Sequence, residues 1–208
     1  MNAYIEAYRL AGERLSGLSS ETVCLNSKAA FSEETGAYSL RYFGQECRIV
    51  CAGGTVEFES PAELPTTEKV LVLHYLINSG PAPLTGRLIS FKEVPNGGLI
   101  YYSTFKKRAI DPLINTFSDD PKGLAEAAVS IGGVKESYGD ASVSVNIFPL
   151  VPVTYAVWRG DEEVAPSGTV LFDASVTDFL PVEDIVVAAS YGTYRLMHGY
   201  KCGKRAGA

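Results

Sequence analysis

Residues 4–18 place hydrophobic side chains at the spacing of one helix face, with charged residues between them, which predicts an amphipathic helix. After Gly36 the helical spacing gives way to alternation, over three short segments separated by glycine-containing turns. These segments are 38–43, 46–51 and 55–59. The alternation and the short turns predict an antiparallel meander of three strands.

Residues 68–78 are predicted to form a helix that is buried on nearly all sides. The segment follows Pro65 and two threonines, and it ends before Gly80-Pro81, which are typical start and stop signals. Its hydrophobic residues occupy almost every face rather than one stripe. A helix of this kind belongs in the centre of a fold.

Helical spacing returns on both sides of Pro112, behind a predicted N-cap at Ser103. The stripe consists of Phe105, Ala109, Leu113 and Phe117. Asp111 and Pro112 either begin a second short helix or kink the first one. A similar Asp-Pro pair predicts a further helix over 122–131.

Strands and helices of the second half come in blocks rather than in regular alternation. The predicted strands are 88–91, 135–138, 141–148 and 153–158. Residues 169–172 fit either a strand or a helix. A last helix is predicted to begin at Pro181 and to run to about Met197. Residues 201–208 are predicted to form a loose polar tail. We therefore expect a single α+β domain over 1–208, with antiparallel sheets, a central apolar helix and further packed helices.

Composition and charge exclude several classes of protein. The 208 residues carry a net charge of −6, which argues against general nucleic-acid binding, because that binding depends on neutralising phosphates. Val145–Trp158 is apolar but contains Asn146, Pro149 and Pro152, and it is too short to span a bilayer. No signal peptide is recognisable, so we expect a cytoplasmic protein without a membrane partner.

Positive charges cluster between Arg87 and Arg108, where five basic residues accompany one acidic residue. A glycine-containing turn and a helix start in this segment add backbone N–H groups, so the cluster is suited to anions. We expect Arg87, Lys106 and Arg108 to bind a small anionic ligand or a protein partner. The alternative is a structural role in which Asp173 or Asp178 pairs with Arg108.

His74 and Asp173 offer an alternative, an enzyme site in which they act as acid and base in a cleft lined by Tyr101 and Tyr102. His74 shares a helix face with Val70, so a core histidine with a satisfied partner is the competing interpretation. No standard catalytic motif is present, and these residues do not decide whether the chain is an enzyme.

Cys47 and Cys51 lie four residues apart on a predicted strand and therefore share one of its faces. They could form a thiol-based metal or redox site, but paired CxxC motifs or Cys/His clusters are absent. Free buried thiols are the default interpretation, and the sequence assigns no metal or cofactor.

Several short motifs together resemble one family of domains. They are His74-Tyr75-Leu76, Pro83-Leu84-Thr85-Gly86, Phe172-Asp173-Ala174-Ser175, Leu180-Pro181-x-Glu183-Asp184 and Trp158-x-Gly160-Asp161-Glu162. The family resembled is an uncharacterised domain of anaerobic bacteria and archaea, and the similarity spans about residues 65–190. Some longer relatives resemble a fusion to a four-cysteine iron–sulfur domain, a module not found in this sequence. The resemblance implies an intracellular anaerobic setting with redox or corrinoid-type proteins nearby, and it implies no catalytic residue.

Overall fold

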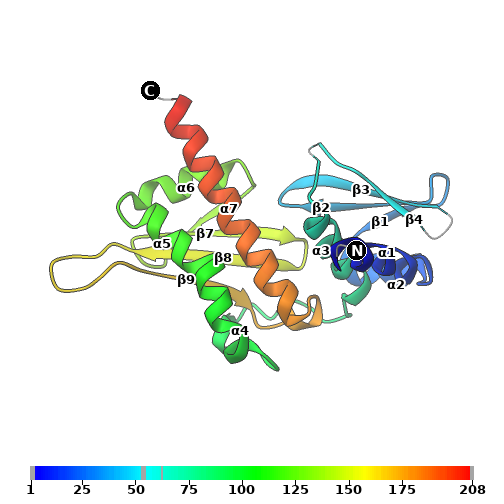
Figure 1. The fold of residues 1–208 in the computed structure, drawn as a ribbon, viewed down its shortest axis with the longest axis horizontal. Coiled ribbons are helices and arrows are strands. Elements are labelled where there is room, and N and C mark those ends of the chain that lie inside the picture. The colour runs from blue at the N-terminus through cyan, green and yellow to red at the C-terminus, as the bar shows by residue number, and fades with distance from the viewer. Residues whose placement is uncertain (1–2, 53–54, 62, 207–208) are drawn as a thin grey trace.

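Two antiparallel sheets organise the chain in the computed structural model, which describes residues 3–52, 55–61 and 63–206 (Figure 1). The first sheet is a meander of β1 (Ala30–Ser32), β2 (Ala37–Tyr42), β3 (Gln45–Ala52) and β4 (Thr55–Glu59) in that order. The second has the order β5 (Leu88–Ser90), β9 (Ser167–Asp173), β8 (Val151–Trp158), β7 (Ala141–Phe148) and β6 (Val134–Glu136). The predicted α+β class with antiparallel sheets is confirmed, and the segment around 169–172 is a strand.

The α-helices are α1 (Ala3–Ser16), α2 (Ser20–Ser27), α3 (Thr66–Asn78), α4 (Gly98–Phe105), α5 (Asp111–Phe117), α6 (Pro121–Val129) and α7 (Val182–Ala206). Short 3₁₀ turns occupy Phe91–Glu93 and Val176–Asp178. The last helix was expected to end near Met197, before a loose tail, but α7 continues through 201–206. None of the described helices has both the length and the apolar character needed to cross a membrane.

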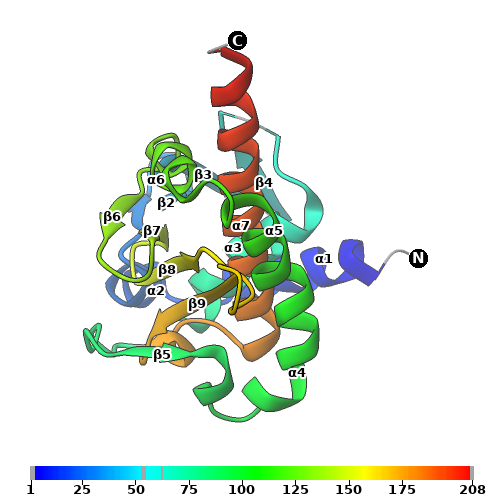
Figure 2. The same ribbon diagram turned by 90° about the vertical axis from the view of Figure 1, so that its left-hand side faces the viewer.

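Helix α3 lies between the two sheets, as the all-round hydrophobic pattern predicted (Figures 1 and 2). The Tyr75 ring of α3 stacks on Phe148 of β7 with ring centroids 4.2 Å apart. The backbone N–H of Phe43 donates to the carbonyl of Ile147 at 3.0 Å, so the β2–β3 turn is tied to β7. Helices α4–α7 cover one face of the second sheet, and α7 crosses from that sheet toward α3 (Figures 1 and 2).

The β2–β3 turn holds a phenylalanine in an uncommon backbone conformation. Phe43 has a φ of 49° and Gly44 a φ of 75°, as a two-residue hairpin turn with two left-handed positions requires. Glycine adopts this conformation freely, whereas Phe43 is strained in it. Because the Phe43 side chain is buried, packing between the two sheets compensates for the strain.

The helical stripe around Pro112 is confirmed, but the local geometry differs from the prediction. Phe105, Ala109, Leu113 and Phe117 are all fully buried. The helix begins at Gly98 instead of at a Ser103 cap, and a π-helical segment, Lys106–Ile110, joins α4 to α5. The N–H of Asp111 donates to the carbonyl of Lys106, five residues earlier, and Pro112, which has no N–H, stands in the first turn of α5.

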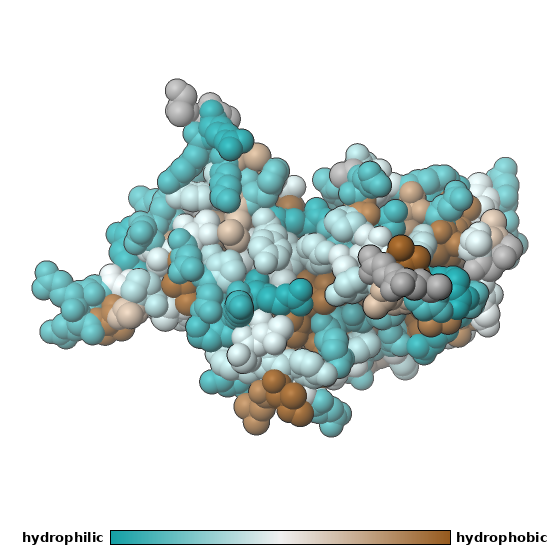
Figure 3. Space-filling view, in the orientation of Figure 1, coloured by the Kyte–Doolittle hydropathy of each residue, from teal (hydrophilic) through white to brown (hydrophobic). Residues whose placement is uncertain are grey.

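Hydrophobic side chains are exposed where α4 begins, at the lower edge of Figure 3. Leu99 is 75% and Ile100 is 82% exposed. Two neighbouring exposed aliphatic residues form a small patch, within the range that ordinary protein surfaces contain.

Candidate functional site

Helices α3 and α7 run antiparallel and are joined by polar pairs along their contact. The Thr67 hydroxyl bonds to the hydroxyl of Tyr191, and Nδ1 of His74 lies 2.7 Å from Oδ2 of Asp184. The order of the partners along α7 is the reverse of their order along α3, so the pairs fix the register of the two helices. Between these pairs the helices leave a hollow, which is bordered by Tyr4 of α1 and Arg108 of the π-helical segment.

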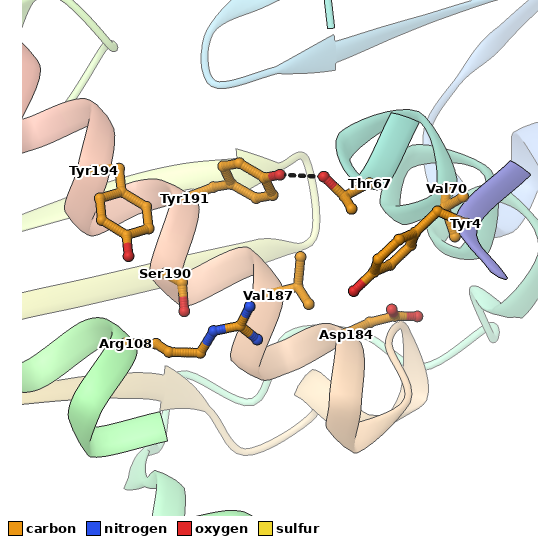
Figure 4. A pocket seen from close by; sticks show the side chains of 9 residues that line it. All are labelled: Tyr4, Thr67, Val70, Arg108, Asp184, Val187, Ser190, Tyr191 and Tyr194. Atoms are coloured by element: carbon orange, nitrogen blue, oxygen red, sulfur yellow. Dashed lines mark hydrogen bonds between the residues drawn. The ribbon is translucent and has the colours of Figure 1, made fainter. Parts of the chain in front are cut away.

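This hollow, the α3–α7 pocket, has a volume of about 140 Å³ (Figure 4). Its wall combines aromatic rings, two valines and a few polar groups. The lining residues are Tyr4, Thr67, Val70, Arg108, Asp184, Val187, Ser190, Tyr191 and Tyr194. Four separate segments of the chain contribute to it, so only the folded chain can form this pocket.

Arg108 projects into the α3–α7 pocket from the π-helical segment (Figure 4). The next two residues, Ala109 and Ile110, are buried, and the hydroxyl of Thr193 on α7 donates to the Ala109 carbonyl at 3.0 Å. The backbone that carries Arg108 is therefore fixed against α7. Within the described ranges the guanidinium has neither an ion pair nor a hydrogen bond, so its donors are free to meet a ligand.

Asp184 is the acidic group of the same pocket, and its side chain is 13% exposed. It sits in the first turn of α7, where the helix dipole favours a negative charge. One of its oxygens is taken by His74, which does not itself line the pocket. Among the lining residues, Arg108 and Asp184 are thus the groups that carry formal charge.

A second polar cluster lies farther along the same helices and is built around a buried carboxylate. Glu68 accepts a hydrogen bond from the Tyr42 hydroxyl at 2.7 Å and pairs with the guanidinium of Arg195 at 2.5 Å. Burial and the nearby Glu68 charge raise the pKa of Tyr42 well above its ordinary value, so its hydroxyl stays protonated and donates. The Arg195 guanidinium also lies over the Phe43 ring, 4.5 Å from its centroid.

This cluster borders a wider cavity of about 610 Å³, which shares Tyr191 and Tyr194 with the α3–α7 pocket. Its arginine, Arg195, is already neutralised by Glu68, so the cavity offers an incoming anion no uncompensated charge from that residue. For this reason the smaller α3–α7 pocket is the better candidate site.

Of the three cations predicted to bind a ligand, only Arg108 lines this pocket. Lys106 pairs with Asp111 on the neighbouring helical turn. Arg87 lies on the exposed segment before β5, where its carbonyl accepts a hydrogen bond from the Ala174 N–H at 2.8 Å. The three side chains are therefore near one another in the sequence but do not meet at one site.

The structure does not pair His74 with Asp173, the two residues of the enzyme alternative. His74 pairs with Asp184 instead. Tyr101, expected beside them, donates its hydroxyl to Glu183 at 2.6 Å. The predicted arrangement is therefore not assembled, because α7 and not β9 supplies the carboxylate next to His74.

Asp173 is a buried anchor for the loop before β5. Its carboxylate accepts hydrogen bonds of 2.6–3.0 Å from the backbone and hydroxyl groups of Thr85 and Ser175 and from the Gly86 N–H. Burial opposes its ionisation, but these hydrogen bonds prevail and lower the pKa of Asp173 to about 2. With its oxygens committed in this way, Asp173 is neither a partner for Arg108 nor a base suited to neutral pH.

Cys47 and Cys51 lie on one face of β3, as their spacing requires. Cys47 is buried, and burial raises the pKa of its thiol to about 11 and raises that of Cys51 as well. Within the described part of the chain, no group of three or more His, Cys, Asp or Glu side chains could hold a metal ion. A thiol that stays protonated is a poor nucleophile, and Cys47 packs in the hydrophobic core.

The residues that sequence reasoning missed are those supplied by α1, α3 and α7. An acidic residue such as Asp184 is common in the first turn of a helix, so its type and position gave no separate signal of a place in the pocket. Tyr191 and Tyr194 are three residues apart and therefore share one face of α7. Two tyrosines on one helix face indicate that this face could line a pocket. That signal identifies a face but not the elements opposite it.

A family model described as "Domain of unknown function (DUF3786)" matches residues 19–195. The matched region includes every lining residue of the α3–α7 pocket except Tyr4, and it contains the motifs between about 65 and 190 on which the resemblance rested. No curated protein and no solved structure matches the chain.

Proposed function

We propose that this chain, which belongs to the DUF3786 family of domains of unknown function, binds a small anionic molecule through Arg108 in the α3–α7 pocket. The observation that carries the proposal is a guanidinium that enters a pocket and meets no partner among the described residues. An arginine offers a planar set of donors that matches a carboxylate or a phosphate.

The surroundings of Arg108 support binding rather than a purely structural role. Its backbone is held by buried neighbours and by the Thr193 hydroxyl, so little backbone freedom is lost when a ligand binds. Aromatic and valine side chains form much of the wall, so apolar surface lies beside the ion pair that would form. Irregular π-helical turns occur frequently at functional sites, and Arg108 lies within one.

The size of the pocket limits the ligand to a small molecule. A volume of about 140 Å³ suits a compact metabolite and not a peptide segment or a folded partner. The acid–base alternative is less well supported, because His74 bonds to Asp184 from outside the lining. A base must lie within hydrogen-bond reach of the proton that it removes.

Thermal unfolding with panels of carboxylates, amino acids and phosphate monoesters tests this proposal. We expect at least one class to raise the melting temperature of the wild-type protein, because a ligand that binds only the folded state stabilises it. Arg108→Gln should weaken that binding by about 10-fold or more, the usual cost of losing a hydrogen bond to a charged group.

Lys107→Gln is the matched control, because Lys107 is exposed, adjacent to Arg108 and absent from the lining. It should bind like the wild type. Equal binding by wild-type and Arg108→Gln proteins, or no stabilisation by any class, would overturn the proposal.

A further inference from the structure

The α3–α7 pocket holds opposite charges that do not neutralise each other directly. Arg108 and Asp184 both line it, yet among the ion pairs of the described residues none joins them. In Figure 4 the guanidinium and the carboxylate are set apart, with the space between them bordered by Val187 and the Tyr4 ring. A ligand placed between them therefore meets a positive group at one end and a negative group at the other.

Asp184 retains one oxygen for such a ligand. Oδ2 faces Nδ1 of His74 at 2.7 Å, whereas Oδ1 has no hydrogen-bond partner within the described ranges. Because the side chain is only 13% exposed, this oxygen has limited access to bulk water. A ligand with a hydrogen-bond donor at this position would satisfy Oδ1 of Asp184.

Three hydroxyls of the wall already have partners inside the protein. The Thr67 and Tyr191 hydroxyls bond to each other, and the Ser190 hydroxyl donates to the Val186 carbonyl at 2.6 Å. Val70 and Val187 add apolar surface. Arg108 and Asp184 are the lining residues that carry formal charge, and Val187 and the Tyr4 ring border the space between them.

Building on the proposed function, we infer that the ligand is a small amino carboxylate, with its carboxylate at Arg108 and its ammonium group at Asp184. A purely anionic molecule such as a phosphate or a dicarboxylate would gain the attraction of Arg108 but suffer the repulsion of Asp184. An amino acid satisfies both charges at once. Its carbon skeleton would lie against Val70 and Val187, which favours a compact aliphatic side chain.

Calorimetric titration with three matched molecules tests this inference. The set is valine, 3-methylbutanoate, which lacks the amino group, and 2-methylpropan-1-amine, which lacks the carboxylate. The same comparison is repeated with glycine and γ-aminobutyrate, because the separation of the two charged ends differs between them. We expect at least one amino carboxylate to bind the wild-type protein about 10-fold or more tightly than its deaminated analogue.

Two substitutions assign that preference to the pocket. Asp184→Asn keeps an oxygen for His74 but removes the negative charge, so it should reduce the preference for the amino group to within about 3-fold. Glu183→Gln is the control, because its carboxylate belongs to the adjacent residue and bonds to Tyr101 outside the lining. That control should keep the wild-type preference.

The outcomes separate this inference from the proposed function. If carboxylates or phosphates without an amino group bind as tightly as amino carboxylates, and Arg108→Gln abolishes that binding, the inference is wrong while the proposed function stands. An amino-acid preference that survives Asp184→Asn would also overturn the inference. If no molecule of any class binds in a way that depends on Arg108, both fail.

Discussion

Replacing Asp173 with asparagine should expose how much the loop before β5 depends on one buried charge. The carboxylate is 4% exposed and accepts hydrogen bonds from Thr85, Gly86 and Ser175. An asparagine at this position would turn an N–H₂ group toward those donors and lose one acceptor oxygen. Asp173→Asn should therefore destabilise the protein at neutral pH.

The size of the effect follows from the pKa of Asp173, which falls from 3.8 to about 2 on folding. At about 1.4 kcal/mol per pKa unit, this lowering corresponds to about 2.5 kcal/mol of stability. A lowered pKa means that the stabilisation is fully present above pH 4 and is lost as the pH falls from 3.8 toward 2. Roughly half of it should be gone by pH 3.

Urea unfolding of both proteins, followed by circular dichroism between pH 7 and pH 3, measures this effect. The difference in unfolding free energy should be about 2.5 kcal/mol at pH 7 and should shrink as the pH falls, because protonated aspartic acid and asparagine are both neutral. Asp161→Asn is the control: Asp161 also accepts backbone N–H groups, but it lies in an exposed turn, so the change should be small. A difference that stays constant over this range would refute the assigned role of Asp173.

Three further predictions concern the rest of the fold. Arg195→Met should cost about 3 kcal/mol in urea unfolding, because it leaves the Glu68 carboxylate buried and unpaired, and adding Glu68→Gln should recover part of that loss; an additive double variant would contradict the pairing. Cys202 should react with a maleimide much faster than Cys47, because Cys47 is buried with a thiol pKa of about 11; equal rates, measured by mass spectrometry on single-cysteine variants, would contradict that burial. Leu99→Ser should change the unfolding free energy by no more than about 0.5 kcal/mol, since that side chain is 75% exposed, and a larger loss would mean that it is packed.

Much of the fold could be predicted from hydrophobic spacing. The strands from Ala37 to Glu59, the helix around Val70 and the stripe through Phe117 all appear where the pattern placed them. Helix α2 and strand β1 were missed, because eight and three residues are too few to establish a period. The length of α7 was underestimated because its last turns are polar and exposed, and packing does not mark their end.

The candidate site was less accessible to sequence reasoning. Arg108 stood out because basic residues and a helix start coincide there, and it lies in the pocket. Arg87 and Lys106 carried the same local signal but face elsewhere, since a cluster of charges along the chain does not fix the direction of each side chain. Asp184 and Tyr191 meet Arg108 only because α7 packs against both α3 and the π-helical segment, a tertiary arrangement that no local pattern encodes.

An NMR titration that follows the Arg108 side chain itself tests most directly whether this residue binds the ligand. Its Nε–Hε signal in a ¹H–¹⁵N NMR spectrum is assigned by its disappearance in Arg108→Lys, and the ligand of the panels that binds most tightly is then added. We expect this signal to shift and to saturate at the same ligand concentration as the calorimetric binding curve, because the guanidinium donates to the carboxylate or phosphate of the ligand. A signal that stays in place while the ligand saturates the protein would contradict the assignment of Arg108 as the anion-binding group.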